Sequence, residues 1–167
     1  TAGAVHLLYP EPLRMSNQTE IDLIDPTLPN PHARSFITAF SRIQAQVHYT
    51  AQDKGWWEER NDLVAVARKY GGNDLAYFAE GVIAASQIAL EHSEISESLE
   101  GIRASEPGAP HPDDKIPAFS MEEAEAADTI IRIMDRAEKR GLRVAEAIIA
   151  KAAMNQTRSR KHGGKAL

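Results

Sequence analysis

The chain contains no cysteine, which excludes disulfides, thiolate zinc sites and cysteine nucleophiles and fits a reducing cytoplasm. No apolar run approaches the roughly 18–20 residues that span a bilayer, so no membrane partner is expected. Basic residues are too few for a nucleic-acid binder: the formal charge is −5, whereas such proteins carry a broad basic surface. With 167 residues, 43% of them hydrophobic, the chain is expected to form one globular domain with a core.

Proline is confined to two stretches. Five of the nine prolines precede residue 32, and the other four lie between residues 107 and 117. Because proline disrupts helix interiors, both stretches are expected to be non-helical. We assign residues 1–35 to an irregular N-terminal segment, with residues 1–14 as leader or added sequence, residues 36–160 to a helical catalytic domain, and residues 161–167 to a basic tail.

Elsewhere, apolar residues recur at helical spacing and no strand-like alternation of any length occurs. Ser35 is the expected N-cap of the first helix, and Ser120 with Glu123 is expected to form a capping box. Short connections between long helices predict an all-α fold, an antiparallel helical bundle of four to five helices. The expected helices cover residues 35–54, 61–69, 74–103, 121–141 and 144–158, with a proline-rich loop at residues 105–119.

Two of these helices carry acidic pairs at a spacing of three, which makes each pair neighbours on a helix. Glu94 and Glu97 share an apolar stripe, and Glu125 with Asp128 repeats the pattern on the next long helix. Two carboxylates about 4 Å apart repel by roughly 4 kcal/mol at an effective dielectric near 20. Four converging carboxylates therefore predict a hard divalent cation, Mg²⁺ or alternatively Mn²⁺.

The spacing alone fits solvated helix faces equally well. Glu91 and Glu100 are expected on nearly opposite sides of their helix, because each step of three residues drifts by about 60°. Arg132 is expected to orient Asp128 or Asp135, and His48 to be packed or exposed rather than a ligand. A di-iron bundle is disfavoured, since no histidine stands three residues after a glutamate.

The end of the chain is basic, with no acidic side chain after Glu146. Lys151, Asn155 and Arg158 are spaced to share one helix face, and Lys165 follows two glycines. Cationic side chains and glycine amides bind phosphate well. The alternative is a helix end complemented by positive charge and followed by a solubilising tail.

Taken together, these segments resemble the MazG-like nucleoside triphosphate pyrophosphatases over about residues 36–165. HSEISESLEGIR looks like the first signature helix of that family, and EEAEAADTIIRIMD looks like the second. KAAMNQTRSRKHGGK resembles the closing segment, and KGWW at residues 54–57 resembles the end of the first helix. Residues 58–81 form a longer stretch than the compact pattern has, and residues 1–35 have no counterpart.

The resemblance implies Mg²⁺-dependent hydrolysis of a nucleoside triphosphate, either a deoxynucleotide or a non-canonical one, to the monophosphate and pyrophosphate. It also implies a homodimer or homotetramer, whereas the cytoplasmic location and the absence of a nucleic-acid polymer as partner are expected from the composition. The implied metal ligands are Glu94, Glu97, Glu125 and Asp128, with Glu97 or Glu94 as the catalytic carboxylate that activates water. The implied substrate-binding residues are Lys151, Asn155, Arg158 and Lys165, which would contact the phosphates. Independently of the resemblance, Trp57 and its neighbour Trp56 are candidates to stack on the base. Packing in the core or in an interface is the alternative for one of the two.

Two other classes of function stay open. A nucleotide-binding regulator with the same fold would bind without hydrolysis, although the presence of all four acids argues against it. A helical interaction module with solvated acids would show no dependence on metal.

Overall fold

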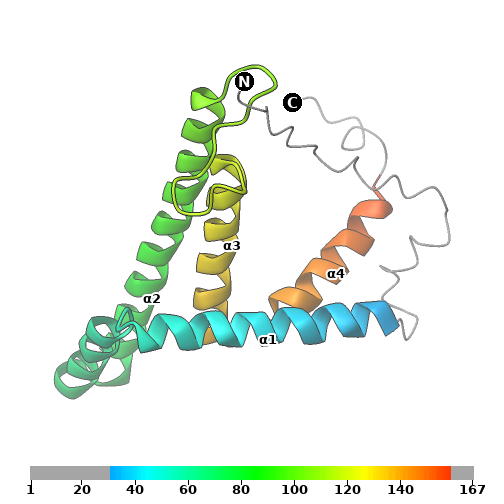
Figure 1. The fold of residues 1–167 in the computed structure, drawn as a ribbon. Coiled ribbons are helices and arrows are strands. Elements are labelled where there is room, and N and C mark those ends of the chain that lie inside the picture. The colour runs from blue at the N-terminus through cyan, green and yellow to red at the C-terminus, as the bar shows by residue number, and fades with distance from the viewer. Residues whose placement is uncertain (1–30, 159–167) are drawn as a thin grey trace. The chain divides into compact units, whose positions relative to one another are not determined.

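The computed structural model describes residues 31–158, which are helical apart from short connections and one loop (Figure 1). Within that range the helices are α1 (Pro31–Asp53), α2 (Glu58–Ala104), α3 (Met121–Lys139) and α4 (Val144–Gln156), with no strand. The predicted all-α helical fold is confirmed. None of the described helices combines the length and the apolar character that crossing a membrane requires.

The described residues belong to two compact units. Residues 38–145 form the first unit, with most of α1, all of α2 and all of α3. Residues 31–37 and 146–158 belong to the second, which therefore contains nearly all of α4. The acidic residues of α2 and α3 all belong to the first unit.

The start of α3 is as predicted from the sequence, whereas the start of α1 is not. Ser120 caps α3, because its Oγ accepts a hydrogen bond from the Glu123 amide at 3.2 Å and Glu123 Oε2 accepts one from the Ser120 amide at 2.8 Å. These bonds from Ser120 favour the ionised carboxylate and lower the pKa of Glu123. The prediction for Ser35 was wrong: α1 begins at Pro31, a residue well suited to the first helical position, and the Ser35 hydroxyl donates to the Pro31 carbonyl within the helix.

Glycine divides α2 into two arms. Gly72 has φ 70° and ψ −162°, a backbone conformation outside the helical region that residues with a side chain rarely adopt. The arm at residues 58–71 corresponds to the predicted short helix, and residues 73–104 correspond to the predicted long one. The core where they meet α1 contains Ala51, Trp57 and Ile83, with Val64 packed against it.

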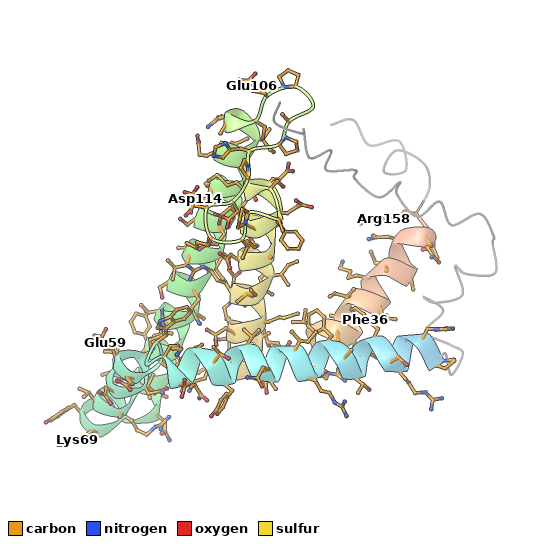
Figure 2. All side chains as sticks on the ribbon, in the orientation of Figure 1. Phe36, Glu59, Lys69, Glu106, Asp114 and Arg158 are labelled. Atoms are coloured by element: carbon orange, nitrogen blue, oxygen red, sulfur yellow. The ribbon has the colours of Figure 1, made fainter. Side chains whose placement is uncertain are left out.

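Helices α2 and α3 lie side by side and antiparallel (Figure 1), joined by the loop that carries Glu106 and Asp114 (Figure 2). Ser98 of α2 is hydrogen-bonded to Glu122 at the start of α3, whereas Glu91, earlier in α2, reaches Arg136 near the end of α3. The proline-rich segment before Ser120 is a loop, as predicted. This pairing brings the acidic residues of the two helices together.

Candidate functional site

Two ion pairs join α2 to α3. Arg136 binds Glu91 through two bonds, Nε to Oε1 at 2.6 Å and Nη2 to Oε2 at 3.0 Å. One turn along, Arg132 Nε donates to Glu94 Oε1. Both glutamates are buried, at 7% and 6% exposure. Charge-assisted bonds of this kind are about twice as strong as neutral ones, so they fix the position of Glu94.

These pairs correct two expectations. Glu91 and Glu100 do lie on opposite sides, one buried and one exposed. However, the inward-facing neighbours on α2 are Glu91 and Glu94, whereas Glu97 is exposed and accepts a hydrogen bond from the Ser93 hydroxyl at 3.2 Å. Arg132 pairs with Glu94 rather than with Asp128 or Asp135, because the antiparallel pairing of the helices sets it opposite α2.

Three of the four predicted metal ligands come together. Carboxylate oxygens of Glu94, Glu125 and Asp128 lie within 4.8 Å of one another. Glu94 is buried, Glu125 half-buried and Asp128 exposed, so the cluster runs from the helix interface to the surface. Arg132 offsets one of the three charges, which leaves an excess of negative charge. Glu97 stands outside this set.

Glu125 has the least satisfied carboxylate of the cluster. Its Oε2 is buried and has no hydrogen-bond partner among the described residues. Burial raises the pKa of Glu125, a contact with the Glu94 carboxyl raises it further, and the charges of Glu97, Glu94 and Asp128 act in the same direction. Two ionised carboxylates cannot share a hydrogen bond, so the contact with Glu94 favours a protonated Glu125.

The residues present fit a hard divalent cation. A buried acceptor that lacks a donor is costly, and carboxylate oxygens are the ligands that Mg²⁺ and Mn²⁺ prefer. A cation bound by Glu94, Glu125 and Asp128 would relieve both the unpartnered oxygen and the mutual repulsion.

Replacing Glu125 by Gln should raise the free energy of unfolding by about 1 kcal/mol in EDTA at pH 7, because a neutral amide removes the buried charge. Because the pKa of Glu125 is raised in the folded protein, the free energy of unfolding of the wild type increases as the pH falls through that raised pKa. The stability difference between E125Q and the wild type should therefore disappear below pH 4.5, the ordinary pKa of the group. Urea unfolding in EDTA at several pH values measures this. A variant less stable than wild type at pH 7 would show that ionised Glu125 has a stabilising partner.

Asp135 supports the neighbouring part of α3 and stands apart from the acidic cluster. Its carboxylate accepts hydrogen bonds from Trp57 Nε1 at 2.9 Å and 3.2 Å and lies 2.6 Å from His48 Nδ1. His48 is thus packed rather than a ligand of the cluster, as expected.

The prediction that Trp57 stacks on a base was wrong. Its side chain is 2% exposed and belongs to the core. Arg60 and Lys139 also lie over the ring, at 5.4 Å and 5.1 Å from its centroid. A ring covered in this way presents no face to a ligand. Trp56, at 61% exposure, is the accessible member of the pair.

A cavity of about 340 Å³ opens beside the cluster, between α1, α2 and α3. Its apolar wall includes Val47, Leu90 and Ile131, and Trp56 stands at its edge. Arg132 lines the cavity and also binds Glu94, so cavity and cluster adjoin. Gln87, 7% exposed, lines it too and makes no side-chain hydrogen bond within residues 31–158. The sequence analysis missed Gln87, because nothing in a helical pattern marks which polar residue borders a cavity.

The predicted phosphate-binding residues belong elsewhere in the chain. Lys151 and Asn155 are exposed on α4, and Arg158 is exposed just after it (Figure 2); all three belong to the second unit. Lys165 lies outside the described residues. Three of the four predicted acidic residues therefore lie together in the first unit, whereas the described basic residues belong to the second unit.

Comparison with known proteins found no match: no protein-family model, curated protein or solved structure corresponds to this chain.

Proposed function

We propose that the chain is a Mg²⁺-dependent nucleoside triphosphate pyrophosphohydrolase that forms a nucleoside monophosphate and pyrophosphate. The observation that carries the proposal is the buried, unpartnered Oε2 of Glu125, which lies among carboxylates supplied by two antiparallel helices. A solvated acidic face would leave no such atom. The resemblance of the signature segments to MazG-like enzymes supplies the reaction class.

The residues of the proposed site have different roles. Glu94, Glu125 and Asp128 would hold the cation, and the hydrogen bond from Arg132 orients the Glu94 carboxylate. When bound, a divalent cation supplies charge neutralisation at phosphate oxygens and a more acidic water. Glu97 is the better proton acceptor for that water, because it is exposed and free of an arginine partner, whereas Glu94 Oε1 is occupied. Lys151, Asn155, Arg158 and Lys165 are proposed to bind phosphates from the basic segment.

The cavity beside the cluster suits the nucleobase. Apolar walls accept the faces of a planar ring, Trp56 offers a stacking surface, and the Gln87 amide offers both a donor and an acceptor to the ring edge. Gln87 replaces Trp57 in the proposed set of base contacts. An amide reads hydrogen-bonding patterns, so we expect preference for one base class rather than uniform activity.

The test is pyrophosphate release from a panel of canonical and modified nucleoside triphosphates, in Mg²⁺ or in EDTA. Release from a subset, in Mg²⁺ only, is expected. Binding without release would favour a nucleotide-binding regulator, and neither binding nor release would favour a helical interaction module. The expected cytoplasmic location belongs to the same proposal.

A second copy of the chain is the proposed partner. Four apolar side chains follow one stripe of α2 and are 42–53% exposed: Ile88, Ile95, Leu99 and Ile102. Monomeric proteins seldom leave such stripes uncovered. Light scattering should give a multiple of the 18.4 kDa chain mass for wild type and a smaller mass for Leu99→Glu. A monomeric wild type would refute this part of the proposal.

A further inference from the structure

A second cavity, of about 550 Å³, lies between the two arms of α2 and the end of α3. Its lining carries four cationic side chains, from Arg60, Arg68, Lys139 and Arg140, and one acidic side chain, Glu80. The cavity is thus strongly positive in a chain whose formal charge is −5. A hollow lined mainly by charges of one sign attracts ions of the opposite sign.

Contacts within the protein explain only part of this charge. Lys139 and Arg140 suit the negative end of the α3 dipole, and Lys139 donates to Asn61 at 2.9 Å. Arg60, from the other helix, donates to the Trp56 carbonyl and lies over the Trp57 ring, so it too has partners within the protein. Arg68 stands 3.8 Å from Glu80 in an exposed pair, which contributes little. The Arg140 side chain makes no hydrogen bond or ion pair within residues 31–158.

The rest of the lining suits a small molecule. Gln87 also borders this cavity, and its amide makes no hydrogen bond within residues 31–158. Tyr77 is 80% exposed at the rim. A Cβ added at Gly81 would meet nothing within 4 Å, so this side of the cavity is open.

We propose that this cavity is a second binding site, for a small phosphate-bearing anion. Guanidinium groups match phosphate geometry with paired hydrogen bonds, and Arg68 and Arg140 approach the cavity from α2 and from the end of α3. The site is built largely from residues 58–81 and their neighbours. It needs neither a divalent cation nor turnover, so it does not depend on the proposed function.

Inorganic pyrophosphate is the probe, titrated into the full chain by calorimetry in EDTA, where the acidic cluster holds no divalent cation. Arg68→Gln and Arg140→Gln should each weaken binding about tenfold, the usual loss for one charge-assisted contact. Lys69→Gln is the matched control: it makes the same charge change at the outer end of the same arm (Figure 2), and Lys69 does not line the cavity. It should bind like wild type.

The result that would overturn the proposal is wild-type binding that both arginine variants retain, or no wild-type binding at millimolar pyrophosphate. Circular dichroism of the variants confirms that they are folded. A failure of pyrophosphate to bind this cavity would not argue against Mg²⁺-dependent pyrophosphate release by the acidic cluster. Absence of that release would likewise not affect the interpretation of this titration.

Discussion

Asp128→Asn should lower Mg²⁺-dependent pyrophosphate release by about 100-fold or more while leaving the fold intact. Asp128 is exposed and makes no hydrogen bond or ion pair within residues 31–158, yet its carboxylate belongs to the cluster. Replacing a residue that only hydrogen-bonds to a metal ligand already lowers metal affinity or activity by about 10–100-fold. Replacing a residue that binds the metal directly should lower activity at least as much. The free energy of unfolding in EDTA should change by less than about 0.5 kcal/mol, as for most exposed positions.

Asp114→Asn is the control for this variant. Asp114 is exposed in the loop between α2 and α3 (Figure 2), and the substitution makes the same chemical change outside the cluster. It should keep wild-type activity. Equal activity in D128N and D114N would mean that the acidic cluster is a solvated surface without a catalytic role.

Arg136→Ala should destabilise the protein by about 3–5 kcal/mol, because it leaves Glu91 charged and unpaired in a buried position. Glu91 and Arg136 side chains are 10% and 16% exposed and share two hydrogen bonds. Urea unfolding of R136A measures the loss. Activity should fall with it, since this pair and the Arg132 pair hold α2 against α3.

Two comparisons isolate the effect of burial. Arg103→Ala breaks an exposed Arg103–Glu100 pair at 2.6 Å, with side chains 63% and 61% exposed, and should cost less than about 1 kcal/mol. The double variant Glu91→Gln, Arg136→Gln should be more stable than R136A, since no buried charge is left alone. If R136A and R103A lose the same stability, the interface does not depend on the buried pair.

Features with a local physical cause were predictable from the sequence. The capping box of Ser120 and Glu123 needs only residues three apart. The gap between the expected helices at residues 61–69 and 74–103 coincides with the break in α2 at Gly72. The acidic pairs were found because helical spacing brings neighbours together. Their convergence in space followed from antiparallel helices, and three of the four predicted metal ligands meet as a result.

Features that depend on a tertiary partner were not predictable. Sequence spacing predicts the angles at which Glu91, Glu94 and Glu97 project around the helix axis. Which two of them are buried depends on the arginines of α3 that pair with them. Trp57 and Trp56 are adjacent in sequence, and only the packing of α1 against α2 makes one the core residue and the other the exposed ring. A proline inside the expected irregular segment became the first residue of α1.

The most direct measurement is ³¹P nuclear magnetic resonance of a mixture of nucleoside triphosphates incubated with the full chain, in Mg²⁺ and in EDTA. The proposed function predicts that one or a few triphosphates convert to equal amounts of monophosphate and pyrophosphate, in Mg²⁺ only. No conversion by folded protein in Mg²⁺, or formation of diphosphate and inorganic phosphate instead, would contradict it.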